Sequence, residues 1–333
     1  MNATFRKRGR LVSLEAGASA CHSWRGMISE HVTEWLGYPV ELFDAAVSEQ
    51  GVKDYSKTIY RLALDWDAEV DFPTLFSHFL DDPASAETPA IIIGQFHGDD
   101  PEQDSEEIVQ LLVSARARLP RLRGIFIGDI VSEENEISEI HQSDISPLFV
   151  TYETLEHLRL RGTEGLSLGG RPCHDKLKSL TIETGGLPPD LFEEIAASQL
   201  PLLEHLELWL GTEAFGGDAT VEDLQPLFQG TIFPNLKHFG LRDSEIADEI
   251  AVALKSAPIL SRIESLDLSL GTLSDEGGQA LVDNPGLRHL KQLDLHHHYL
   301  SDDMMIRLEL AFPSVNLDDA KGDEHDRSVA VSE

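Results

Sequence analysis

Histidines stand at equivalent places in three copies of one short apolar phrase, and more histidines follow its last copy. The first three are His157, His205 and His238, and the later group is His296–His298. Imidazole rings together with a carboxylate such as Asp294 are ligands that Zn²⁺ accepts. Alternate residues of a strand share one face, so we expect His296, His298 and Asp294 to point the same way.

The spacing of these copies argues against a metal site. A copy that carries Ser179 separates the copies of His157 and His205. Because neighbouring strands lie about 4.8 Å apart, those two histidines are about twice that distance from each other. A zinc site usually needs three or four ligands around one ion. We therefore expect no metal and no cofactor.

Acid–base catalysis has little more support. Asp267 and Asp294 occupy equivalent places in neighbouring copies and could share a proton, but duplicated units carry similar residues without any catalytic reason. The sequence has no phosphate-binding loop, no G-x-S-x-G elbow, no H-E-x-x-H and no paired C-x-x-C. We expect no enzyme. The alternative is a metal-assisted enzyme, or a subunit of one, with its site near Trp209 and the strand histidines.

The phrase that carries these residues recurs six times with a fixed apolar pattern. Its copies read LEHLRL, LKSLTI, LEHLEL, LKHFGL, IESLDL and LKQLDL, beginning at Leu155, Leu177, Leu203, Leu236, Ile263 and Leu290. Such a pattern, repeated every 22 to 33 residues, predicts a leucine-rich-repeat solenoid of the α/β class, a horseshoe with parallel strands on its concave face. A degenerate copy at Leu122 is counted as the first repeat.

Helices are expected between the strands, on the convex face. Their starts are signalled by a hydroxyl side chain before acidic residues, as at Thr220, Ser244, Ser274 and Ser301. The expected helices are Phe72–Leu80, Gln103–Leu119, Asp190–Ala197, Val221–Phe228, Glu245–Leu254, Asp275–Val282 and Asp302–Leu310. Two earlier strands are expected at Tyr60–Leu64 and Ala90–Gly94.

Two units offset by 27 residues, each with a full helix, make the stretch Leu122–Leu317 resemble the ribonuclease-inhibitor-like class of leucine-rich repeats. Where many such repeats place Asn or Cys after the strand, this chain often has Gly, as at Gly162 and Gly211, so we expect its turns to rely on glycine's backbone freedom. With its acidic inserts, the whole chain is also similar to a family of bacterial cytoplasmic leucine-rich-repeat proteins. That resemblance brings no catalytic residue with it.

Four segments are expected. Residues 1–26 are disordered or extraneous, with Met27 as the natural start; 27–120 form an N-terminal capping region with irregular repeats; 121–317 form the solenoid; and 318–333 form a disordered acidic tail. No apolar run reaches the roughly 20 residues of a membrane span. Two cysteines are too few for a disulfide-stabilised secreted scaffold, so a cytoplasmic location is expected.

A net charge of -33 disfavours nucleic acid and anionic membranes as partners and favours a basic protein or peptide. Most acids fall in helix starts and inserts, whereas the exposed strand positions are nearly balanced. Trp209 on such a position is a candidate interface anchor, unless it packs against the insert 212–219 and Phe215. The sequence thus predicts a non-enzymatic scaffold that binds a partner through its concave face and acidic inserts. The expected contact residues are Arg159, Arg161, Glu183, Glu207, Trp209, Arg242, Asp267, Asp294 and His296.

Overall fold

The computed structural model describes residues 28–43, 53–65, 67–98, 102–162, 164–322 and 326–332. The predictions for residues 1–26 and for a start at Met27 lie outside these ranges. Across the described ranges, every helix is too short or too polar to cross a bilayer.

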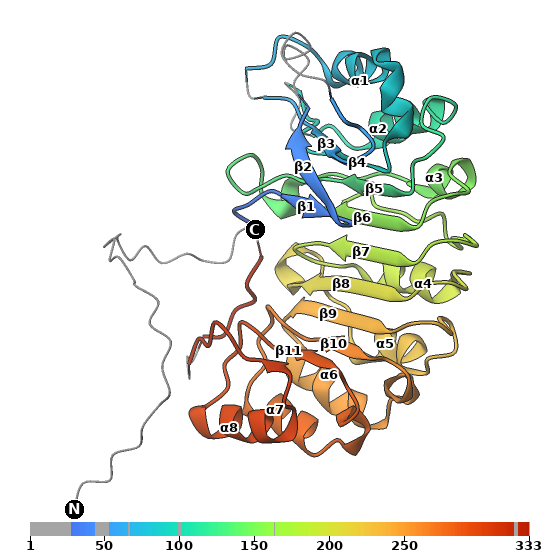
Figure 1. The fold of residues 1–333 in the computed structure, drawn as a ribbon. Helices are drawn as coiled ribbons and strands as arrows, with labels where there is room; N and C mark the ends of the chain where they lie inside the picture. The colour runs from blue at the N-terminus through green and yellow to red at the C-terminus, as the bar shows by residue number, and fades with distance from the viewer. Residues whose placement is uncertain are drawn as a thin grey trace, which may run out of the picture.

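Twelve strands form one sheet whose order follows the chain, and they stack into the curved ribbon of Figure 1. The first pair is antiparallel, and all later neighbours are parallel. The sheet runs without a break across the boundary that we expected between residues 120 and 121. Its strands are β1 (Glu34–Trp35), β2 (Tyr38–Leu42), β3 (Ile59–Leu62), β4 (Ala90–Ile93), β5 (Gly124–Ile127), β6 (His157–Arg161), β7 (Ser179–Glu183), β8 (His205–Gly211), β9 (His238–Ser244), β10 (Ser265–Asp267), β11 (Gln292–Asp294) and β12 (Val315–Asn316).

Helices lie along one side of this strand stack, between successive strands (Figure 1). They are α1 (Phe72–Asp81), α2 (Glu106–Ser114), α3 (Ser146–Thr151), α4 (Pro189–Ala197), α5 (Val221–Phe228), α6 (Ala247–Ala253), α7 (Asp275–Val282) and α8 (Asp302–Ala311). The fold is the predicted leucine-rich-repeat solenoid, with strands on the concave face and helices on the convex face. The helix α3 has no counterpart in the sequence-based expectation.

Helix starts follow the expected capping chemistry in three of four cases. Thr220 forms a capping box with Asp223, and the side chains of Ser274 and Ser301 accept hydrogen bonds from the first turns of α7 and α8. The prediction for Ser244 is wrong. This residue ends strand β9, three residues before helix α6 begins at Ala247, and its hydroxyl accepts a bond from the backbone N–H of Ile246.

Leucines of the repeated phrase fill the space between strands and helices. In the third copy Leu203, Leu206 and Leu208 are completely buried, and the equivalent positions of the other copies join the same core cluster. Each such side chain contributes about 1.5–3 kcal/mol through removal of its apolar surface from water. The alternation leaves the residues between these leucines on the opposite, concave face.

Glycine permits the tight turns after several strands. Gly162 and Gly211 both have positive φ, and a Cβ on Gly211 would lie 1.8 Å from the carbonyl oxygen of Gly185. This confirms the predicted reliance on glycine at these two turns.

The N-terminal segment covers the concave face of the first repeats. Residues 32–40 pack on an apolar patch built from the outward side chains of β3, β4 and β5, and Trp35 contacts Phe126 there with ring centroids 6.1 Å apart. A strand face that would otherwise be exposed is apolar here because another part of the chain lies over it. The covering segment explains the outward-facing Ile59, Ile92 and Phe126.

The prediction of a disordered tail is wrong for the C-terminal residues 326–332. Residues 326–332 run past the carboxyl ends of the later strands (Figure 1). Val329, Ala330 and Val331 are buried, and the backbone N–H of Ala330 bonds to the carbonyl of Leu270. The acidic composition of the tail hid this short apolar run, whose burial holds the segment in place.

Candidate functional site

Beyond the N-terminal cover, the concave face is open over strands β6 to β9. A hollow of about 320 Å³ lies there, and its walls combine imidazole, guanidinium, hydroxyl and indole groups. Its lining residues are Trp35, His157, Leu158, Arg159, Ser179, Thr181, His205, Glu207 and Arg242. Most come from alternate strand positions, which the parallel register places side by side.

Glu183, fully buried at the end of β7, anchors the charged groups on one side of the hollow. It binds the Nε atoms of both Arg159 and Arg161, the latter at 2.7 Å. Arg161 also donates to the carbonyl of Ile130 at 2.7 Å and lies 3.7 Å from the carboxylate of Asp129. Burial would raise the pKa of Glu183, but the two arginines outweigh it and lower that pKa.

Glu207 binds the polar and charged groups on the other side of the hollow. Its Oε1 accepts hydrogen bonds from the indole N–H of Trp209 at 2.9 Å and from Arg242 at 2.8 Å. Arg242 stacks over the Trp209 ring, 5.0 Å from its centroid, and lies 3.4 Å from Asp267. Burial alone would raise the pKa of Glu207, yet the bond from His205 and the charge of Arg242 hold it well below its usual range.

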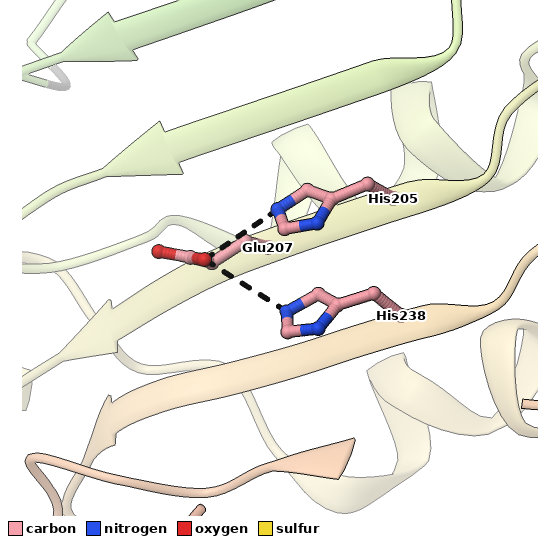
Figure 2. A group of neighbouring side chains, drawn as sticks. All are labelled: His205, Glu207 and His238. Atoms are coloured by element: carbon pink, nitrogen blue, oxygen red, sulfur yellow. Dashed lines mark ion pairs between the residues drawn. The ribbon is translucent and has the colours of Figure 1, made fainter. Parts of the chain in front are cut away.

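Two imidazoles approach the other oxygen of Glu207. The Nε2 atoms of His205 and His238 lie 3.5 and 3.9 Å from Oε2 (Figure 2). The rings are stacked, with centroids 4.1 Å apart and an angle of 4° between planes. Burial and the neighbouring His205 lower the pKa of His238 to about 4. Within the described part of the chain, this is the one group of three residues whose ligand atoms are close enough for a shared metal ion.

The structure brings together most of the nine predicted contact residues, but it pairs them with one another. Arg161, Glu183, Trp209 and Asp267 are buried, so a partner cannot reach them in this arrangement. The remaining five are partly exposed: Arg159, Glu207, Arg242, Asp294 and His296.

Trp209 is covered by a different segment from the one considered in the sequence. Its side chain is 7% exposed and belongs to a cluster with Ile137, Ala330 and Val331. Phe215, in the insert, is 38% exposed and lies outside that cluster. Trp209 is therefore part of the contact that holds the C-terminal segment.

The later histidines have separate roles. His296 bonds Asp294 through Nδ1 at 2.8 Å, whereas His298 is fully buried and contacts the carbonyl of Leu317 through Nε2 at 3.1 Å. The expectation that they point the same way is wrong, because the chain turns at His297, where φ is positive. Nor do the carboxylates of Asp267 and Asp294 share a bond: the first pairs with Arg242, the second with His296.

Two contributors to the site were missed in the sequence. Trp35 lines the hollow, and Asp129 lies buried beside Arg161, where burial raises its pKa despite that arginine's charge. Both come from outside the repeated phrase. The only signal in the sequence was Trp35 itself, an aromatic residue in the N-terminal stretch. It does not indicate which strands this residue would pack against.

A crystal structure of a protein from Bacteroides fragilis is similar to this chain over most of its length. The sequences are 33% identical, the match covers 82% of this chain and 77% of the other, and the TM-score is 0.76. No protein-family model matches the chain. No curated protein matches it either.

Two further solved structures match more loosely. One is an internalin from Listeria monocytogenes, with 15% identity, a TM-score of 0.28, and coverage of 79% of this chain and 81% of the other. The second is TLR13 in complex with ssRNA13, with 16% identity, a TM-score of 0.35, and coverage of 78% of this chain and 31% of the other.

Proposed function

The chain belongs to the same family as the Bacteroides fragilis protein, and on this premise we propose that it is a non-enzymatic scaffold for a protein or peptide partner. The partner binds the concave face, which in a solenoid presents many strands side by side. Units of 27 residues with a full helix favour the ribonuclease-inhibitor-like class for these repeats. The relative's organism and the free, exposed Cys173 favour a bacterial cytoplasm.

The observation that carries the proposal is the uncovered hollow over β6 to β9. The N-terminal segment covers one end of the concave face, and the C-terminal segment packs beside the carboxyl ends of the later strands. The hollow between them presents the partly exposed charged side chains of Arg159, Glu207 and Arg242 in fixed positions. Their buried ion pairs hold them before any partner arrives, so that binding loses little side-chain entropy. The C-terminal segment offers an internal example of an extended peptide held at the edge of this face through backbone N–H groups.

A basic partner fits the negative charge of the chain and of its inserts. The chain carries -33 overall, and acidic residues crowd the inserts, while the hollow pairs its arginines with carboxylates. Such a field accelerates the approach of a positively charged protein and weakens its binding as salt screens the attraction.

Affinity purification from the native organism at low salt, with mass spectrometry of the proteins released as salt rises, tests the proposal. Ser179→Trp fills the hollow between His157 and His205 without breaking an ion pair, and Glu193→Trp places the same indole on exposed helix α4 as a control. We expect the partner to be recovered with the wild type and Glu193→Trp and lost with Ser179→Trp. Equal recovery with all three proteins would refute the concave-face site.

A further inference from the structure

We infer that His205, Glu207 and His238 form a binding site for one divalent transition-metal ion of the Zn²⁺ type. Each residue offers one ligand atom, and these three atoms lie within 4.8 Å of one another. Two imidazoles with one carboxylate form an established zinc ligand set that leaves a coordination position open. The inference stands apart from the scaffold function, because it concerns binding of the ion alone.

The distances require only small movements. Oε2 of Glu207 lies 3.5 Å from Nε2 of His205 and 3.9 Å from Nε2 of His238. In a tetrahedral site with bonds of about 2.0–2.1 Å, ligand atoms are about 3.4 Å apart. The two rings are parallel in the structure, so binding must tilt them until both lone pairs point at the ion.

The strongest support for a metal site comes from the hydrogen bonding of the two ring nitrogens of His238. Its Nδ1 lies 3.1 Å from the hydroxyl of Ser265, while its Nε2 is buried and has no hydrogen bond to any residue that the structure describes. When Nδ1 donates to Ser265, Nε2 presents a lone pair to the carboxylate of Glu207. A cation between these two groups would turn that repulsion into coordination, and the bond to Ser265 is the outer contact that fixes a ligating histidine.

Glu207 is oriented for the same task. Trp209 and Arg242 both bind its Oε1, which leaves Oε2 to face the imidazoles. The positive charge of Arg242 opposes a nearby cation, but Asp267 also pairs with that arginine and reduces its effect. His205 and Glu207 also line the hollow, so water or a group from a partner can occupy the remaining coordination position.

Calorimetric titration of the chelator-treated full chain with ZnCl₂, and visible absorption spectra with Co²⁺, test the site. We expect one ion per chain and a Co²⁺ spectrum typical of nitrogen and oxygen ligands. His205→Asn and His238→Asn should each weaken binding at least about 100-fold, and Ser265→Ala about 10-fold, since outer contacts are worth about 10–100-fold in affinity. His157→Asn is the matched control, because His157 lies in the same strand row but outside the group.

The site is overturned if the wild type takes up no Zn²⁺, or if the His205→Asn/His238→Asn variant binds as tightly as the wild type. It is also overturned if His157→Asn loses affinity to the same extent. Both ligand histidines are partly exposed, so the variants should fold, and circular dichroism of the metal-free proteins checks this. Failure of these tests leaves the partner experiment with Ser179→Trp unaffected, because that readout needs no metal.

Discussion

The backbone N–H of Val331 donates a 2.8 Å hydrogen bond to Oδ1 of Asp243, a fully buried carboxyl on strand β9. This contact joins the end of the chain to the middle of the sheet. Burial raises the pKa of Asp243 well above its usual range, against the bonds from Val331 and Ala330 and the charge of Arg242, with Glu245 acting in the same direction as burial. Docking of the C-terminal segment and protonation of Asp243 are therefore linked.

This linkage has a defined sign. A carboxyl with a raised pKa in the fold favours the folded state most at low pH, and that contribution is lost as pH rises from the unfolded value through the folded one. Asp243→Asn keeps an acceptor for Val331 and tolerates the positive φ at this position, but it cannot ionise. We expect the variant to gain stability over the wild type at pH 8 and to lose that advantage toward pH 4, as measured by urea unfolding. An advantage that does not change with pH would contradict the linkage.

Removal of residues 326–333 should expose Trp209. Val329, Ala330 and Val331 would lose their burial, at a cost of about 1.5–3 kcal/mol for each valine. The lost backbone hydrogen bonds of Ala330 and Val331 add to this cost and the entropy of the released residues opposes it, so we expect a small net loss of stability. Tryptophan emission should shift to longer wavelength, and the shift should vanish in a truncated chain that also carries Trp209→Phe. An unshifted spectrum after truncation would mean that the segment does not cover Trp209.

Loss of Glu183 should be among the most damaging single changes on the concave face. Glu183→Ala leaves Arg159 and the buried Arg161 without their shared carboxylate, which typically costs about 3–5 kcal/mol. The matched control is Glu204→Ala, which breaks an exposed pair with Lys237 and should cost about 0–1 kcal/mol. Chemical denaturation compares the two variants, and similar losses would show that the buried network contributes no more than a surface pair.

Gly211→Ala tests the turn after β8. Its added Cβ would meet the carbonyl oxygen of Gly185 at 1.8 Å, whereas a Cβ on Gly216, which also has positive φ, meets nothing within 4 Å. Both variants bear the conformational cost of about 1–2 kcal/mol for a left-handed residue. Gly211→Ala should lose about 3 kcal/mol more than Gly216→Ala in urea unfolding. Equal losses would indicate that the close approach of the two turns relaxes easily.

Local patterns in the sequence were sufficient for the repeats. The L-x-x-L-x-L phrase identified β6 to β11, and helices α5 and α7 begin and end where the apolar spacing and caps placed them. Those features depend on residues within a few positions of one another, which is what periodicity and capping report.

Contacts between distant segments could not be read in the same way. The cover of Trp209 by Val331 joins residues 122 positions apart, and neither residue carries a signal for the other. Ser179 separates His157 from His205 in the strand row, whereas His205 and His238 stand on adjacent strands and form the close group with Glu207. The register of strands β8 and β9 decides which histidines lie beside Glu207, and that register follows from the packing of the whole stack of strands.

The most direct test of the scaffold account is photo-crosslinking from the hollow. A benzophenone amino acid at position 179 lies between the strands of His157 and His205, and the same group at position 193 lies on exposed α4. After capture at low salt and illumination, we predict a covalent adduct between the chain and its partner from position 179 and none from position 193. A partner that crosslinks from position 193 and never from position 179 would contradict binding through the concave face.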